Sequence, residues 1–319
     1  MKKSLKLIMA LVLALTLSGC AFMEKFENFI GRSSPESSSE ASDPESGGLS
    51  ELSEPEAPEW PVTVAGATIL EPPHSIAVLS PSLYEIMREM GVDGAVTGIG
   101  SYCDNPHSLP ELGTALAPDI KAIKAVAPQY LLTSAPLPEQ ELTQLQQANI
   151  EVIILTPANR LSELESLYTN LGLLTSGLTV GVELSGKYWD GCMELLDKAA
   201  QKAKALENAR TALYLRISGL TVATADTLEG ELLTKLGFVN AAEKYGGWIY
   251  PEEDTDALSP DVIIADSAIT EDELENSELY RNCPAVKNGL VVRTDMGVFE
   301  RQGRGMFEAL LTVVNKLCR

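Results

Sequence analysis

Histidine and cysteine, which often bind metals or act as nucleophiles, are few in this sequence. The histidines are His74 and His107, whereas zinc and manganese sites usually combine several histidines with carboxylates. We therefore expect no free-metal site, although axial coordination of a haem iron by His107 stays open. The cysteines after residue 20 show no C-x-x-C spacing, so they predict no zinc or redox motif, and their disulfide pairing stays open: Cys103, Cys192, Cys283 and Cys318.

Serine and carboxylate residues also lack the arrangements that enzymes use. The chain contains no G-x-S-x-G elbow, no P-loop, no H-E-x-x-H and no dinucleotide-binding glycine pattern. Asp104 and Asp295 form a carboxylate pair only if the fold brings them together, and no spacing indicates that it does. We therefore expect a protein that binds its ligand without catalysis, and we assign no catalytic residue.

Polar and aromatic side chains follow many of the short apolar runs after residue 60. In doubly wound α/β lobes the ligand lies outside the carboxyl ends of the strands, so we expect contacts there. Aromatic rings suit a broad planar ligand because they offer large contact area with few rotatable bonds. Arg216 and Arg304 could meet an anionic group, but a solvated surface role fits them equally well. The candidates are Ser80, Ser82, Tyr102, Cys103, Asp104, Ser134, Asp226, Asp295, Phe299 and Arg301.

Short apolar runs alternate with helical stretches, which predicts an α/β fold. Ser82 and Glu85 have capping-box spacing at the start of the first helix, and Gly91 is expected to end it. In the first half we expect strands at 76–79, 95–99, 130–133 and 152–155, and helices at 82–90, 138–149 and 161–174. In the second half we expect strands at 211–216, 222–224, 262–265 and 291–294.

Two local repeats predict that the halves are related. Residues 127–132 resemble 259–264, and residues 85–91 resemble 231–237, in the same order along the chain. Between the halves, residues 179–206 predict one helix of about 26 residues and roughly 40 Å that permits only small lobe movements. Its glycines, Gly181, Gly186 and Gly191, weaken the first part of that helix. Its apolar stripe is Leu184, Tyr188, Cys192, Leu195, Ala199 and Ala203.

The first 20 residues predict export and lipid attachment. Lys2, Lys3 and Lys6 precede an apolar run that is short for a membrane span, and residues 17–20 resemble the bacterial lipobox. That resemblance implies acylation of Cys20, the alternative being an ordinary signal peptide with a chance cysteine. Residues 21–58 are expected to be a disordered acidic tether rich in Ser, Pro and Glu. The net charge of -21 argues against nucleic-acid binding.

With these elements in order, residues 60–319 resemble the solute-binding proteins of the vitamin B12 and iron-siderophore ABC importers. Residues 76–106 carry a Ser-Pro-Ser turn and a Tyr-x-Asp-x-Pro loop similar to those of the family. The run 301–305 departs from the family's Arg-Pro-Gly-Pro-Arg pattern. Further similar segments are 119–132, 222–227, 246–248, 259–262 and 299–301.

The resemblance implies two similar α/β lobes joined by one long α-helix, with the ligand cleft between the lobes (class III). The expected boundaries are 59–178, 179–206 and 207–319, and the chain is expected to be a monomer. The resemblance adds Trp248 and Tyr250 to the ligand candidates and implies that Glu253 docks on the permease. The matching first-lobe position is Lys121, so another acid, such as Glu111 or Asp119, would dock there or docking would differ.

The implied function is that of a lipid-anchored extracytoplasmic receptor that delivers its ligand to an ABC permease and ATPase complex. A corrinoid is favoured, because the 102–106 loop resembles the cobalamin-type members and the cleft candidates contain few arginines. The ligand would be cargo, and no resident cofactor is expected. The alternatives are an iron-siderophore or haem receptor of the same family and a cell-surface lipoprotein without a transport role.

Overall fold

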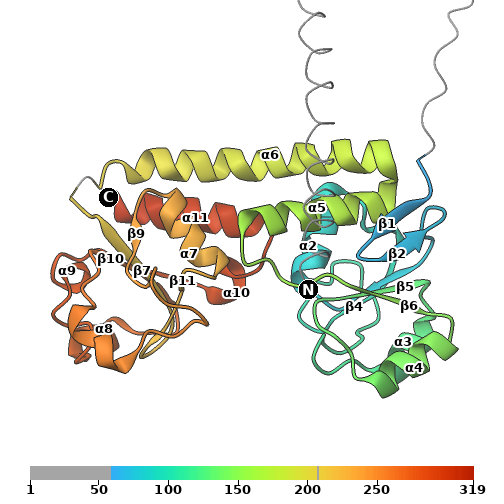
Figure 1. Cartoon of the computed structure of the whole chain (residues 1–319), viewed down its shortest axis with the longest axis horizontal. Helices are drawn as coiled ribbons and strands as arrows, with labels where there is room; N and C mark the ends of the chain where they lie inside the picture. Colours follow the sequence, from blue (N-terminus) through green and yellow to red (C-terminus); the bar gives the residue numbers. More distant parts are fainter. Residues whose placement is uncertain (1–58, 207) are drawn as a thin grey trace, which may run out of the picture. The chain divides into compact units, whose positions relative to one another are not determined.

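The structure is a computed structural model that describes residues 59–206 and 208–319. Two α/β lobes are joined by one long helix, α6 (Leu178–Ala203), as Figure 1 shows, which confirms the expected fold class. The expected signal segment, Cys20 and the tether lie outside the described residues. Within the described residues, no helix is both long and apolar enough to cross a membrane.

The first lobe contains a four-stranded parallel sheet in the order β4-β3-β5-β6. Every residue of the central strands β3 and β5 is buried, as expected for strands covered on both faces. The strands are β3 (Ile76–Val78), β4 (Val96–Ile99), β5 (Tyr130–Thr133) and β6 (Glu151–Ile154), preceded by an antiparallel hairpin of β1 (Val62–Val64) and β2 (Ala67–Ile69). The helices are α2 (Pro81–Met90), η2 (Asp93–Ala95), α3 (Ile120–Val126), α4 (Glu139–Gln147) and α5 (Leu161–Ser176).

The second lobe contains a five-stranded sheet centred on β7 and β10, which pair in parallel. β8 is antiparallel to β7 and ends at Val222, so the strand expected at 222–224 is shorter than predicted and lies earlier. The strands are β7 (Thr211–Ile217), β8 (Thr221–Val222), β9 (Val239–Asn240), β10 (Val262–Asp266) and β11 (Val291–Thr294). The helices are α7 (Leu228–Lys235), η3 (Glu252–Ala257), α8 (Glu271–Asn276), α9 (Pro284–Lys287), α10 (Met296–Phe299) and α11 (Arg304–Leu317).

The parallel strands of the two lobes follow the same connections. In the first lobe β3 pairs with β4 and β5, and β5 pairs with β6. In the second lobe β7 pairs with β9 and β10, and β10 pairs with β11. The repeat at 127–132 leads into β5 and its match at 259–264 into β10, while the repeat at 85–91 lies on α2 and its match at 231–237 on α7. The repeats therefore occupy equivalent positions in two similar lobes.

The start of α2 differs from the prediction. Its N-cap is Ser80, whose hydroxyl oxygen accepts a hydrogen bond from the amide of Leu83 at 3.5 Å. The capping box predicted for Ser82 and Glu85 is therefore wrong. Gly91 ends the helix as expected, with a φ of 71° that a residue with a side chain rarely adopts.

The buried face of α6 also differs from the predicted stripe in the first half of the helix. Leu184 and Tyr188 are only half-buried, whereas Ser185 and Trp189 occupy the buried positions. The second half follows the prediction, with Cys192, Leu195, Ala199 and Ala203 buried.

The reason for the difference is the close approach of α5 and α6. A Cβ atom added to Gly181 would lie 2.3 Å from the carbonyl oxygen of Gly172, and one added to Gly172 would lie 2.3 Å from that of Gly181. Only glycine at both positions allows the two backbones to approach this closely. Gly181 was expected to weaken α6, but in the structure it permits the contact that holds α6 against α5.

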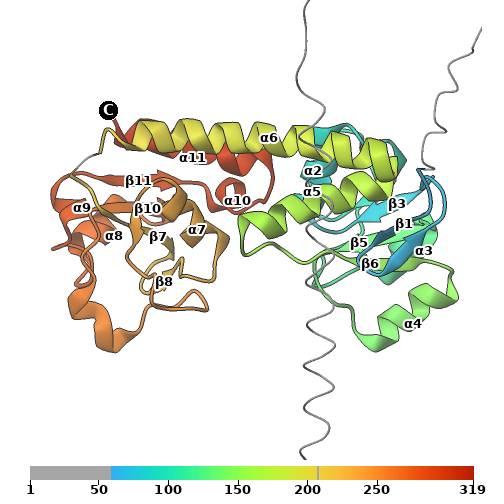
Figure 2. The same cartoon turned by 45° about the horizontal axis from the view of Figure 1, so that its top comes forward.

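One apolar core continues from the first lobe through α5 and α6 into the second lobe. On α6, the ring of Trp189 lies 5.8 Å from that of Tyr168 on α5 and 6.2 Å from that of Phe307 on α11. Figures 1 and 2 both show α6 running alongside α5 and then α11. The connecting helix is therefore packed against both lobes by large aromatic side chains.

Candidate functional site

The loop after β4 brings three predicted residues together on the first lobe. Gly100 lies so close to β3 that an added Cβ atom would lie 2.3 Å from the carbonyl oxygen of Leu79. The loop therefore turns at the end of the sheet, and the side chain of Tyr102 is 73% exposed. Cys103 follows with a half-buried thiol, and burial raises its pKa to about 11, so it remains protonated near neutral pH.

Asp104 completes this loop and contacts arginines from both lobes. Its carboxylate lies 3.9 Å from the Arg88 guanidinium on α2 and 3.6 Å from that of Arg301, just before α11. Arg301 also lies 3.8 Å from Glu85 on α2. Arg301 is thus shared between two first-lobe carboxylates, and its charge is offset by them.

The three predicted serines have different surroundings. Ser80 is buried as the cap of α2, so its hydroxyl serves the helix. The Ser82 hydroxyl accepts a hydrogen bond from the backbone amide of Gln302 at 3.1 Å and so faces the second lobe. Ser134 is half-buried directly after β5. Ser82 and Ser134 remain candidates for contact with a ligand.

On the second lobe, Asp226 shapes the turn that contains Trp248. Its carboxylate accepts hydrogen bonds from the Thr224 hydroxyl at 2.6 Å and from the Gly247 amide at 3.0 Å. These bonds, that of Thr224 first, hold the pKa of Asp226 below its usual value. The Trp248 amide in turn donates to the Thr224 hydroxyl at 3.2 Å, and Trp248 has a φ of 65°. Asp226 therefore fixes the turn that carries Trp248.

The Trp248 ring belongs to a layered aromatic group at the end of β7. The guanidinium of Arg216 lies over the ring at 4.8 Å and also pairs with Glu300 at 2.8 Å. The Tyr214 ring meets Trp248 edge-on at 6.3 Å, and its hydroxyl donates to Glu300 at 2.9 Å. Trp248 is half-buried, so part of its ring stays accessible beside a fixed cation.

Three other predicted residues of the second lobe make internal contacts. Tyr250 is only 3% exposed and meets Tyr245 edge-on at 4.7 Å. Phe299 is 1% exposed and stacks on Tyr214 at 5.0 Å. In this conformation neither ring presents its face to a ligand. Asp295 is exposed but caps α10 by accepting the Gly297 amide hydrogen at 2.8 Å.

A buried carboxylate lies close to this aromatic group. Glu229 on α7 is almost completely buried, and burial together with the nearby Glu300 carboxylate raises its pKa to about 7. Burial likewise raises the pKa of Glu300. The pair with Glu300 at 2.8 Å holds Arg216 in place over Trp248.

Sequence reasoning missed a set of exposed apolar side chains near the ends of the strands. Ile217 is the last residue of β7, and Ile249, which directly follows Trp248, is 62% exposed. Thr221 bridges to Ile249 and also pairs with Ile217, so the two isoleucines are close. The sequence signal for Ile217 was its position at the end of a strand, just before the turn that contains Gly219. Other exposed apolar side chains near strand ends are Ile154, the last residue of β6, and Val298 on α10, which follows β11.

The residues expected to dock on a permease are at the surface. Glu253 is exposed on η3, which carries four acidic residues among its six. On the first lobe Lys121 is exposed on α3, and Asp119 caps that helix by accepting the Ala122 amide hydrogen at 2.9 Å. Glu111 is also exposed and lies where its backbone bridges to Ile99.

Two other kinds of site can be compared with the predicted ligand residues: a metal site and a separate pocket. Among residues 59–206 and 208–319, no three His, Cys, Asp or Glu residues are grouped so that they could hold a metal ion. A pocket of about 530 Å³ lies beside β11 and the end of α11, lined partly by Arg293 and Lys316, and contains none of the predicted ligand residues.

Comparison with known proteins gives a consistent family match. A family model described as "Periplasmic binding protein" matches residues 76–296. No curated protein matches the chain.

Several solved structures share the fold at low sequence identity. A possible iron-binding (periplasmic solute-binding) protein from Staphylococcus epidermidis is 18% identical, with a TM-score of 0.65 over 78% of this chain and 100% of that one. The periplasmic heme-binding protein from Roseiflexus is 19% identical, with a TM-score of 0.63 over 77% and 98%. The periplasmic vitamin B12 binding protein of Vibrio cholerae is 18% identical, with a TM-score of 0.58 over 77% and 97%. At these identities the likeness concerns the fold and favours no ligand.

Proposed function

Because the chain belongs to the periplasmic binding protein family, we propose that it is the lipid-anchored receptor of an ABC importer and binds a corrinoid. The family model matches residues in both lobes and the connecting helix, which supports a binding role for the whole folded body. The lipobox-like residues 17–20 support anchoring through Cys20 on the extracytoplasmic face of the membrane. Fatty-acid labelling that depends on Cys20 would test the anchor.

The choice of a corrinoid rests on the charge of the candidate site. Arg88, Arg216 and Arg301 each lie 2.8 to 3.9 Å from a carboxylate, so their positive charges are offset within the protein. A catecholate iron chelate carries several negative charges and would need cations that are not already paired. A corrinoid has a broad ring with neutral amide side chains, which suits exposed apolar and aromatic groups together with carboxylates and hydroxyls.

The apolar surface supports the same ligand. Tyr102 on the first lobe, and Ile217 and Ile249 beside Trp248 on the second, expose apolar area near the ends of the strands. Large exposed apolar side chains in one region often mark a binding surface. A broad ring could bury such area on both lobes at once.

The decisive experiment is to mix the purified chain with cyanocobalamin, haemin and a set of ferric siderophores and to record native mass spectra and calorimetric titrations. We expect a one-to-one complex with cyanocobalamin. If haemin or a ferric siderophore bound more tightly than cyanocobalamin, the ligand would belong to that alternative class and not to the corrinoids. Binding of none of them would favour a cell-surface lipoprotein without a transport role.

Docking on the permease is proposed to use Glu253 on the second lobe and Glu111 on the first. Both carboxylates are exposed, whereas Asp119 already caps α3 and Lys121 has the opposite charge. Exposed carboxylates can pair with arginines of a membrane partner without disturbing the ligand site.

Replacing Glu253 by lysine is expected to leave ligand affinity unchanged and to reduce uptake at least tenfold, because charge reversal converts attraction to repulsion at the docking surface. Uptake of the bound ligand by cells that carry the variant and its transporter is the measurement. Glu275→Lys on α8, another exposed acid of the same lobe, is the matched control. Equal uptake by Glu253→Lys and the wild type would exclude Glu253 from docking.

A further inference from the structure

The two lobes are connected by side-chain contacts as well as by α6, and these contacts concentrate on residues 301–304. Gln302 makes side-chain hydrogen bonds across the lobes and is only 7% exposed. Its side-chain carbonyl accepts the Ala158 amide hydrogen at 2.8 Å, and its amide nitrogen donates to the Ala158 carbonyl at 2.6 Å. One side chain of the second lobe thus satisfies both backbone groups of a residue that leaves the first-lobe sheet.

Backbone hydrogen bonds of the same segment reach α2 of the first lobe. The Gln302 amide donates to the Ser82 hydroxyl at 3.1 Å, and the Arg304 amide donates to the Glu89 carboxylate at 3.3 Å. A further interlobe bond comes from α7, where the Glu231 carboxylate accepts the Leu161 amide hydrogen at 2.9 Å and so caps α5. Buried donors and acceptors that lose such partners are costly to leave unpaired.

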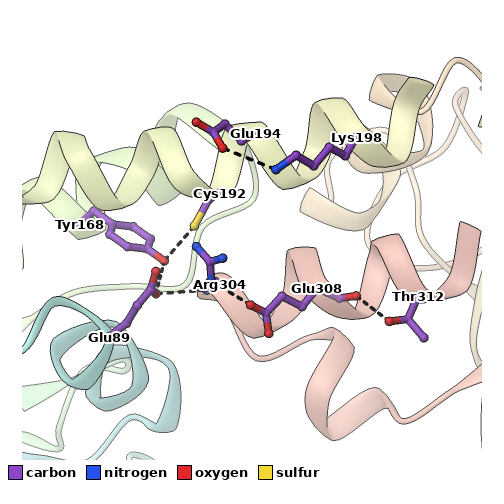
Figure 3. A network of polar contacts seen from close by, with 8 residues as sticks. All are labelled: Glu89, Tyr168, Cys192, Glu194, Lys198, Arg304, Glu308 and Thr312. Carbon is purple, nitrogen blue, oxygen red and sulfur yellow. Dashed lines mark hydrogen bonds and ion pairs between the residues drawn. The ribbon is translucent and has the colours of Figure 1, made fainter. Parts of the chain in front are cut away.

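Glu89 extends this set of contacts into the connecting helix, as Figure 3 shows. The Tyr168 hydroxyl on α5 donates to Glu89 at 2.8 Å and lies 3.3 Å from the sulfur of Cys192 on α6. Burial raises the pKa of Tyr168, so its hydroxyl keeps the proton that it donates. Helices α2, α5, α6 and α11 therefore meet in one polar network beside the Gln302 contacts.

We propose that residues 301–304 form an interlobe clasp and that Gln302 is the positioning residue that sets the spacing of the two halves of the ligand site. Arg301, next to Gln302, contacts Asp104 in the first-lobe loop that carries Tyr102. Glu300, on the other side, holds Arg216 over Trp248. A shift of this segment therefore moves ligand-facing groups of both lobes together.

The clasp affects binding because a site held in its ligand-competent arrangement loses less freedom when the ligand binds. A chain without the clasp would populate other lobe spacings, and its apparent affinity would fall with the fraction of molecules that remain competent. This consequence for the ligand rests on the proposed receptor function, whereas the effect on lobe spacing does not.

The full chain offers a matched pair of variants. Asn240, in the second lobe, is a buried amide that also donates to one backbone carbonyl and accepts from one backbone amide, those of Ala223 and Ala242. Gln302→Ala and Asn240→Ala therefore remove similar bonds, one pair between the lobes and one pair within a lobe. Spin labels on p-acetylphenylalanine at Lys124 and Glu275, both exposed, report the interlobe distance by pulsed electron resonance.

We expect a broader or shifted distance distribution for ligand-free Gln302→Ala and an unchanged one for Asn240→Ala. If Gln302→Ala does not fold, Gln302→Glu serves instead, because it keeps the length and the acceptor while losing the amide donor. A wild-type distribution in a folded Gln302 variant would overturn the clasp.

Binding is then measured with whichever probe of cyanocobalamin, haemin or ferric siderophore the wild type binds. We expect Gln302→Ala to weaken that binding by about tenfold, mainly through faster dissociation, and Asn240→Ala to leave it unchanged. Unchanged dissociation in a variant with altered lobe spacing would overturn the positioning role. If the wild type binds no probe, the receptor proposal fails, while the distance measurement still decides the clasp.

Discussion

Replacing Trp248 by alanine is expected to weaken ligand binding at least tenfold. The substitution removes the largest accessible ring on the second-lobe side and leaves Arg216 without its aromatic partner at 4.8 Å. A tenfold loss corresponds to about 1.4 kcal/mol of binding free energy, which is within the range of a truncated aromatic contact. Alanine keeps the backbone amide that bonds Thr224, so the turn itself can persist.

Calorimetric titration of the variant with the ligand that the wild type binds is the measurement. Tyr188→Ala is a suitable control, because Tyr188 is half-buried and also has a cation over its ring, that of Lys187 at 5.8 Å, but lies on α6. Trp248→Phe should recover most of the lost affinity, since it restores a flat ring. Equal affinity of Trp248→Ala and the wild type would remove Trp248 from the ligand site.

Opposite effects on stability are expected from two glycine substitutions on α6. Gly181→Ala should lower the free energy of unfolding by about 1–3 kcal/mol, the usual cost of overpacking a filled interior. The new Cβ atom would meet backbone atoms of Gly172 and Leu173 at 2.3 to 2.8 Å, and backbone atoms cannot rotate away. Gly186→Ala should raise the free energy of unfolding by about 0.5–1 kcal/mol, since no atom lies within 4 Å of its added Cβ and alanine favours the helix.

Urea unfolding of both variants beside the wild type tests this pair of predictions. The same substitution on one helix makes each variant the control for the other, because any general effect of alanine would act equally on both. If Gly181→Ala were more stable than the wild type, α5 and α6 could separate slightly without a loss of unfolding free energy. The close contact at Gly181 would then not be required for stability.

Strand positions could be predicted because buried parallel strands appear as short apolar runs. β5 lies where expected, and β3, β4 and β10 differ from the expected ranges by one residue at one end. The relation between the lobes was visible because equivalent strands and helices kept similar residues in the same order. The cap of α2 was missed because Ser80 and Ser82 are both suitable hydroxyls, and only the backbone conformation at Ser80 selects between them.

The candidate site was less predictable, because a residue near the end of a strand can face outward or inward. Tyr102 and Tyr250 are both tyrosines in loops, yet one is 73% and the other 3% exposed. The difference arises from Tyr245, which is close in sequence, and from the packing of the second-lobe core, which is not local. The sequence showed only that residues 301–305 depart from the family pattern. The contact of Gln302 with Ala158 could not be predicted, since the two residues are 144 positions apart.

The amino-acid sequence by itself determined the α/β character, the two related lobes and the single helix between them. These features follow from local apolar patterns and turn residues, which act over a few positions of the chain. The tertiary structure alone decided which rings are accessible, which arginines are already paired and where the lobes contact each other. Those properties depend on the free energy of contacts between residues far apart in the chain, and no local pattern records such contacts.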